Sequence, residues 1–370
     1  MRFVKYILLS VFLFNFTIII LAQDKDTTKE DEVLRIETQL VDVPFVVMDK
    51  SGKPLLNLKK NNFVVYEDGK KQELSDFAAT SAPFEVALLL DTSGSTRSDL
   101  ALIQRAAESF INSLRPGDRV SIAAFKSYRE DNKSIAVSEV LTYLTDDRNK
   151  LKNALADVKT SNGTPYYDGL LQVVEKVFRE TPKDEFRGRR ALVALTDGVD
   201  STSIAGFDEV SEEFGRAGIV SYFIQVDTRE FFEENLLGDC DGAMRFSQAQ
   251  IRRYYRTFYP KSKIEKVFNF CNLGDFERLD ISQRLYGLAD AEMQSLAKMS
   301  GGKVFPAADL SEARGAFAKV AQEIGTKYSL GYYSTNEKRD GSYRKIKIEL
   351  KGVPAGAQIR AREGYIAPIN

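Results

Sequence analysis

Residues 84–227 alternate between short apolar runs and longer stretches with helical spacing. The run VALLL at 86–90 is typical of a strand buried on both faces of a sheet. Apolar side chains then recur every third or fourth position through 98–114, which predicts an amphipathic helix. The pattern predicts further strands at 119–125, 189–198 and 219–227, and helices at 148–158 and 165–178. Strands that alternate with helices indicate a doubly wound α/β domain, with a mostly parallel sheet and helices on both faces.

Shorter strand-like segments flank this domain on both sides. Residues 36–80 contain β-rich runs separated by candidate turns at Ser51-Gly52 and Asp68-Gly69. Residues 326–370 contain three segments of period two, which predict antiparallel strands. We therefore expect a central α/β domain at 84–325 and a small β-rich, sandwich-like module that both flanks build together.

The segment 227–288 interrupts the α/β pattern and is predicted to be an insertion. Its stretch QIRRYYRTFYPKSKIEKVFNF combines basic and aromatic residues. One interpretation is a surface that binds a partner or nucleic acid. The other is an amphipathic helical insertion whose Tyr254, Phe258 and Phe268 pack inward. Balanced charge in the surrounding sequence favours the second interpretation.

The N-terminus has the pattern of an export signal. Arg2 and Lys5 precede an apolar run that ends near Ala22, so we predict a signal peptide at 1–22, with an uncleaved anchor as the alternative. Residues 23–35 are predicted to be a polar linker, and the mature protein is expected to be periplasmic or secreted, without a membrane span. In an oxidising compartment the two cysteines, Cys240 and Cys271, are expected to form a disulfide.

Composition and charge exclude several classes of function. The chain has 370 residues, 43% hydrophobic and 28% charged, which is enough to bury a large core. Its net charge of -1 provides no overall field that would attract nucleic acid. Histidine is absent, which excludes Ser-His-Asp catalysis, Cys-His catalysis and histidine-ligated zinc. We therefore expect a binding protein rather than an enzyme.

Oxygen-bearing side chains gather where predicted strands and loops end. Asp91, Ser93 and Ser95 form a D-x-S-x-S pattern directly after the strand at 86–90. Thr164 lies in the loop TSNGTPYYDGL, and Asp197 follows the strand ALVALT. Ligands of doubly wound sheets bind at the carboxyl ends of the strands, so these five residues are expected to converge. Taken singly, each could instead cap a helix or form a turn, as Thr164 before Pro165 could.

A site built only from oxygen ligands suits Mg²⁺, with Mn²⁺ or Ca²⁺ possible. Two carboxylates balance the charge of the cation, and the neutral hydroxyls leave it electrophilic. An open coordination position would then attract a carboxylate of a partner protein or surface. One alternative is a metal-dependent hydrolase, although Ser93 stands where such a D-x-D strand end has its second carboxylate. Another is a structural envelope protein with an empty site.

The three-part motif resembles the metal-ion-dependent adhesion site of von Willebrand factor type A (VWA) domains. Asp91, Ser93, Ser95, Thr164 and Asp197 match the five positions of that site, and the resemblance covers about 84–325. The flanks DKSGKPLLNLKKNNFVVYEDGK and REGYIAP resemble those of secreted VWA proteins of acidobacteria and related bacteria. The resemblance implies an adhesion or binding module in which the hydroxyls contact Mg²⁺ directly and the aspartates act partly through water. The sequence SNGTP departs from the more usual double glycine before the threonine.

Overall fold

The computed structural model describes residues 40–94, 100–229, 233, 246–261 and 270–369. These residues all belong to one compact unit, Thr38–Asn370. The predicted signal peptide at 1–22, the linker at 23–35, Ser95, Cys240 and Phe268 lie outside the described residues, so the predictions that rest on them stay predictions. Within the described ranges, no helix is long and apolar enough to cross a membrane.

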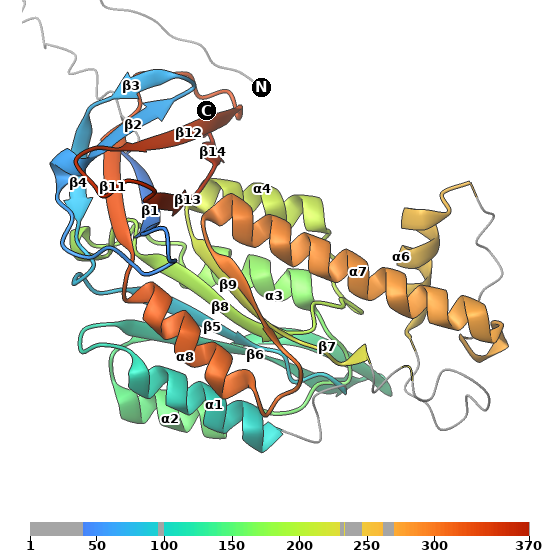
Figure 1. Ribbon diagram of the computed structural model, residues 1–370. Helices are drawn as coiled ribbons and strands as arrows, with labels where there is room; N and C mark the ends of the chain where they lie inside the picture. Colours follow the sequence, from blue (N-terminus) through green and yellow to red (C-terminus); the bar gives the residue numbers. More distant parts are fainter. Residues whose placement is uncertain (1–39, 95–99, 230–232, 234–245, 262–269, 370) are drawn as a thin grey trace, which may run out of the picture. The chain divides into compact units, whose positions relative to one another are not determined.

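A six-stranded sheet forms the centre of the α/β domain, in the order β10-β9-β8-β5-β6-β7 (Figure 1). Its strands are β5 (Glu85–Leu90), β6 (Arg119–Glu130), β7 (Lys133–Thr145), β8 (Arg190–Thr196), β9 (Val220–Val226) and β10 (Lys303–Ala307). Neighbouring strands are parallel except β6 and β7, which are antiparallel. The predicted doubly wound, mostly parallel sheet is therefore confirmed. The long edge strand β7 is not predicted by the sequence pattern.

Helices cover both faces of this sheet. Successive side chains of a strand point to opposite faces, so the apolar residues of β5 must be buried on both sides. Val86, Leu88 and Leu90 share a core with one set of helices, and Ala87 and Leu89 share a second core with another set (Figure 1). The first set is α1 (Leu100–Ser113), α2 (Arg148–Ala156) and α8 (Ala313–Ile324); the second is α3 (Tyr166–Gln172), α4 (Phe207–Ala217) and α7 (Asp275–Ser300). Short helical segments are η1 (Lys60–Asn62), the π-helical η3 (Val173–Val177), η4 (Asp184–Phe186) and η5 (Phe270–Asn272).

Both flanks of the chain contribute strands to two four-stranded sheets, ordered β13-β1-β11-β4 and β14-β12-β2-β3. The strands are β1 (Leu40–Met48), β2 (Phe63–Glu67), β3 (Lys70–Gln72), β4 (Leu74–Ala78), β11 (Tyr328–Tyr333), β12 (Tyr343–Leu350), β13 (Gln358–Ala361) and β14 (Gly364–Ile366). Every strand pair in them is antiparallel. The two sheets share one hydrophobic core, in which Phe45 lies against Phe63 and Tyr328. The predicted sandwich-like module built from both flanks is confirmed.

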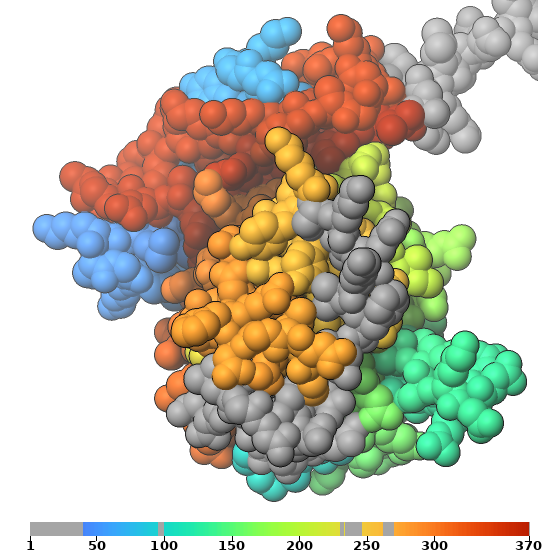
Figure 2. All heavy atoms as spheres, turned by 90° about the vertical axis from the view of Figure 1, so that its right-hand side faces the viewer, coloured from blue at the N-terminus to red at the C-terminus, as the bar shows by residue number. Residues whose placement is uncertain are grey.

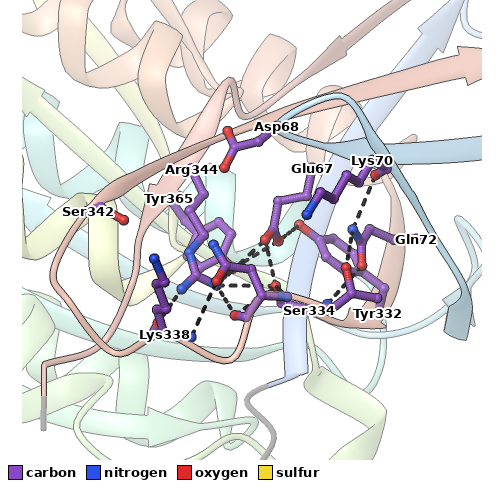
Figure 3. Close-up of polar contacts among 12 residues, drawn as sticks. Glu67, Asp68, Lys70, Gln72, Tyr332, Ser334, Lys338, Ser342, Arg344 and Tyr365 are labelled. Carbon is purple, nitrogen blue, oxygen red and sulfur yellow. Dashed lines mark hydrogen bonds and ion pairs between the residues drawn. The ribbon is translucent and has the colours of Figure 1, made fainter.

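A buried polar cluster closes one end of this sandwich (Figure 3). The Glu67 carboxylate accepts hydrogen bonds from the hydroxyls of Tyr332 (2.8 Å), Tyr365 (2.9 Å) and Ser334 (2.5 Å). Arg344 lies 3.6 Å from the same carboxylate, and both side chains are almost fully buried. Because buried charges are tolerated only when they are paired and hydrogen-bonded, the cluster ties β2, β11, β12 and β14 together.

Two connections join the sandwich to the α/β domain, at residues 79–84 and 325–327. The fully buried Arg189 binds both of them. Its guanidinium donates to the carbonyl oxygens of Ala82 (2.6 Å), Pro83 (2.9 Å) and Lys327 (3.0 Å). The Arg189 side chain thus holds both connections between the sandwich and the α/β domain in place.

The predicted insertion contains helix α6 (Gln248–Phe258) and the first half of α7. Tyr254 is buried in a small core, against which Phe258 packs, so the inward packing of these two aromatic residues is confirmed. Helix α7 continues without a break through residue 288, where the insertion was predicted to end. One long helix therefore serves both the insertion and the α/β core (Figure 1).

Candidate functional site

Two of the predicted site residues follow neighbouring parallel strands. Asp91 comes directly after β5, and Asp197 comes directly after β8. The backbone N–H of Asp91 donates to the Leu195 carbonyl at 2.9 Å, and the Thr196 hydroxyl donates to Asp91 Oδ2 at 2.7 Å. Both aspartates therefore lie at the same edge of the sheet, as ligands at the carboxyl ends of parallel strands require.

The chain turns back sharply after Asp91. The backbone N–H of Ser93 donates to Asp91 Oδ1 at 3.0 Å, which forms an Asx turn. The Thr92 hydroxyl is held by the Phe125 carbonyl at the neighbouring strand β6. Ser93 is consequently placed next to Asp91 and is only 3% exposed. Ser95, the third residue of the pattern, lies outside the described part of the chain.

The loop that carries Thr164 is bound to both strand ends. The N–H of Ser161 donates to the Thr92 carbonyl at 2.7 Å on one side. On the other side Thr164 and Ser201 exchange two hydrogen bonds: the Thr164 N–H donates to the Ser201 hydroxyl, and the Ser201 N–H donates to the Thr164 carbonyl. Helix α3 begins only at Tyr166, and its N-cap residue is Pro165, which makes no side-chain capping bond. The Thr164 hydroxyl thus does not serve as the helix cap that the alternative interpretation assigns to it.

Asp197 is held by residues that the sequence motif does not contain. Its Oδ1 accepts the N–H of Val199 at 3.0 Å, and its Oδ2 accepts the Thr228 hydroxyl at 2.7 Å. Thr228 follows β9 and lies 2.7 Å from the Tyr286 hydroxyl of helix α7. A chain of hydrogen bonds therefore connects the predicted metal site to the insertion. Tyr286 also lines a cavity of about 570 Å³ between α7 and the ends of β9 and β10.

A third carboxylate, Asp200, lies at the same edge and was not predicted. Its Oδ1 accepts the N–H of Tyr166 at 3.0 Å and the Ser203 hydroxyl at 2.5 Å. Burial raises the pKa of Asp200 to about 6. Asp200 thus positions the start of α3, directly beyond Thr164. Its only sequence signal is its place in TDGVDS, which is equally typical of a turn.

The electrostatics of this edge are compatible with a bound cation. Burial raises the pKa of Asp91, hydrogen bonds from Ser93 and Thr196 lower it, and the Asp200 carboxylate raises it. The Tyr166 hydroxyl is buried without a hydrogen-bond partner among the described residues. Buried carboxylates that repel one another and an unsatisfied phenol are features that a divalent cation with its water would relieve.

The donor set defines which cation could bind. The described residues contain no group of three or more Asp, Glu, Cys or His side chains that could hold a metal. A cation at this edge would instead depend on hydroxyl oxygens together with two carboxylates. Ser93, Thr164 and Asp197 are 3%, 7% and 4% exposed, so these oxygens are already largely desolvated. Such a hard, all-oxygen set suits Mg²⁺ better than Zn²⁺.

The comparisons with known proteins agree with this architecture. Residues 86–199 match the von Willebrand factor type A domain family, and this range contains all five predicted site residues. No curated protein sequence matches the chain. The part of the α/β domain that carries the predicted site, residues 86–199, is thus similar to von Willebrand factor type A domains.

Solved structures that resemble the chain are distant in sequence. Proximal thread matrix protein 1 of the mussel byssus is 12% identical, with a TM-score of 0.43, over 78% of this chain and 51% of that one. A von Willebrand factor type A protein from Catenulispora acidiphila is 11% identical, with a TM-score of 0.39, over 90% and 75%. The pilus adhesin SpaC from Lactobacillus rhamnosus GG is 10% identical, with a TM-score of 0.40, over 88% and 48%. The chain thus spans about half the length of the mussel and pilus proteins.

Proposed function

We propose that the protein is an exported, Mg²⁺-dependent binding module that engages a carboxylate of a partner protein or surface. The observation that supports this most strongly is that hydrogen bonds hold three separate segments, which carry Asp91 with Ser93, Thr164, and Asp197, at one edge of the sheet. A motif whose residues only capped helices or formed turns would not need to assemble in this way.

Each of these residues would have a distinct role toward the metal. The hydroxyls of Ser93 and Thr164, together with Ser95, would bind Mg²⁺ as neutral ligands. Asp91 and Asp197 would balance its charge, partly through water. Mn²⁺ or Ca²⁺ could replace Mg²⁺, since both accept oxygen ligands. Because the protein ligands carry only two negative charges, the cation keeps affinity for one more anionic oxygen, and a partner carboxylate supplies it.

Binding is a better account of this edge than catalysis. Hydrolysis at a metal site needs a base that is free to activate water. Asp200 is an additional carboxylate at this edge, and its oxygens already accept hydrogen bonds from Tyr166 and Ser203. The absence of histidine from the sequence removes the most common alternative base. Export is proposed from the signal-like residues 1–22, and the disulfide between Cys240 and Cys271 belongs to the same proposal.

Calorimetric titration of Mg²⁺ into the chelator-treated protein tests the proposal. We expect the wild type to release or absorb heat with one binding event and Asp91→Ala to show none. Thr164→Val should weaken binding by roughly tenfold, because one hydroxyl ligand is lost while the side chain keeps its shape. Asp146→Ala removes an exposed carboxylate elsewhere and should behave as wild type. Equal heats from wild type and Asp91→Ala would refute the site.

A further inference from the structure

Helix α6 has two chemically different faces. Ile251 and Tyr254 are buried in the core of the insertion, whereas Arg252 and Arg256 are exposed on the opposite face. Lys261 is exposed shortly after the helix ends. Part of the gold surface of α6 is visible in Figure 2. The inward aromatic face and a basic outer face therefore coexist in one helix.

The exposed basic residues Arg252 and Arg256 of α6, and Lys261 after it, have no acidic partner among the described residues, unlike other basic residues nearby. Arg253 donates to both oxygens of Glu292, at 2.8 and 2.9 Å, and Arg284 pairs with Asp280. No described residue forms an ion pair with Arg252, Arg256 or Lys261; Arg252 donates a hydrogen bond to the Gln248 side chain at 3.1 Å. The outer face of α6 consequently carries positive charge that the described part of the protein does not neutralise.

Contacts of Ser247 and Arg253 place helix α6 beside the segments that carry Thr164 and Ser201. The Ser247 hydroxyl lies 3.4 Å from the carbonyl of Ser201, the residue that binds Thr164. The Arg253 guanidinium lies over the Tyr167 ring at 4.9 Å, three residues beyond Thr164. Its charge also acts on Asp200, lowering the pKa of that carboxyl against the effect of burial. Arg252 and Arg256 both lie within one helical turn of Arg253, a rise of at most about 5.4 Å along the helix axis.

The orientation of α6 is fixed by its own contacts. A capping box between Ser247 and Gln250 satisfies its first backbone N–H groups. The hydroxyls of Tyr254 and Tyr255 bind Asp280 and Glu277 of helix α7. The arginines are thus presented from a rigid helix, which reduces the entropy lost when a partner binds them.

We propose that the outer face of α6 is a second contact for a carboxylate-rich protein segment, one carboxylate of which is taken by the metal site. This inference rests on the proposed function and extends it to the class of partner. A basic face next to a cation that takes a carboxylate selects a chain with several carboxylates in succession. A nucleic acid is a poorer match, because three buried carboxylates, Asp91, Asp197 and Asp200, border the same edge and the overall net charge is -1.

Two labelled peptides and fluorescence anisotropy test this inference. One peptide is rich in glutamate; the other has a single glutamate, with glutamine at the remaining positions. With Mg²⁺ at low salt, the wild type should bind the glutamate-rich peptide about tenfold more tightly than the single-glutamate peptide. The double variant Arg252→Glu with Arg256→Glu should lose this preference and keep its affinity for the single-glutamate peptide. Arg252→Gln with Arg256→Gln should lose most of the preference without adding negative charge.

A matched control is the double variant Lys70→Glu with Lys71→Glu, which reverses two exposed charges on β3 of the sandwich. This control should retain the preference. If the α6 variant retained it too, or if the wild type showed none, the inference would be overturned. Tighter, Mg²⁺-independent binding of a single-stranded oligonucleotide would also overturn it, in favour of nucleic acid. The proposed function fails separately, if Asp91→Ala or chelator leaves binding of the single-glutamate peptide unchanged.

Discussion

Gly302 lies between the end of α7 and the start of β10, with no room for a side chain. A Cβ added at this position would stand 1.8 Å from the carbonyl oxygen of Ser221 and 2.7 Å from its carbonyl carbon. The Gly302 N–H donates to the Ala297 carbonyl at 2.8 Å, so the residue cannot simply swing away. The atoms in conflict are backbone atoms of β9, which a side-chain rotation cannot relieve.

The cost of Gly302→Ala follows from this geometry. An ordinary contact requires the Cβ and the oxygen to separate by more than about 1 Å further, which pushes β9 and β10 apart at the start of their pairing. Overpacking of this kind costs about 1 to 3 kcal/mol, and we expect about 3 kcal/mol because both partners are rigid. For a domain of this size the melting temperature should fall by roughly 6 to 12 °C.

Gly287, inside helix α7, provides a matched control. A Cβ there meets nothing within 4 Å, so Gly287→Ala should stabilise α7 by about 0.5 to 1 kcal/mol. Differential scanning calorimetry of both variants beside the wild type measures the two shifts. A Gly302→Ala protein that melts at the wild-type temperature would show that the packing described for β9 and β10 is wrong.

Three further predictions concern buried charges and the cysteines. Burial lowers the pKa of Lys327 from 10.5 to about 7. Between these two values the unfolded state binds more protons than the folded state, so the free energy of unfolding should rise with pH from about 7 to 10.5. Urea titrations should show this rise for the wild type and a flatter pH dependence for Lys327→Met. Glu67→Gln weakens the sandwich cluster and should cost about 2 kcal/mol, with hydrogen exchange increased first in the sandwich strands. Cys271→Ser should destabilise only the insertion, and free thiols on both Cys271 and Cys240 in exported protein would contradict the predicted bridge.

The sequence predicts the fold well where hydrophobic periodicity is strong. Strands β5 and β8 contain continuous apolar runs, at 86–90 and 191–195, because both of their faces are buried, and the helix predicted at 98–114 shows the spacing of α1. Strand β7 escapes prediction because it is an edge strand whose residues are mostly half-buried, so its sequence shows no clean alternation. The pairing of strands from both flanks is predictable only as a hypothesis, since no local pattern encodes contacts across about 270 residues.

The candidate site is predictable for a different reason. Asp91, Ser93 and Thr164 are named by a motif whose spacing has a chemical meaning. Thr228 and Tyr286 belong to no motif, because they act through hydrogen bonds that only the folded chain creates. Residues that support a site from separate elements leave little trace in a single sequence.

The measurement that tests the central claim most directly is a crystal structure of the protein grown with Mn²⁺, in which the metal is located by anomalous scattering. The proposed site predicts one strong peak at coordination distance from the hydroxyls of Ser93 and Thr164, beside Asp91 and Asp197. A structure without a peak there, or with Mn²⁺ bound only elsewhere, would contradict the account and leave these residues as turns that shape the edge of the sheet.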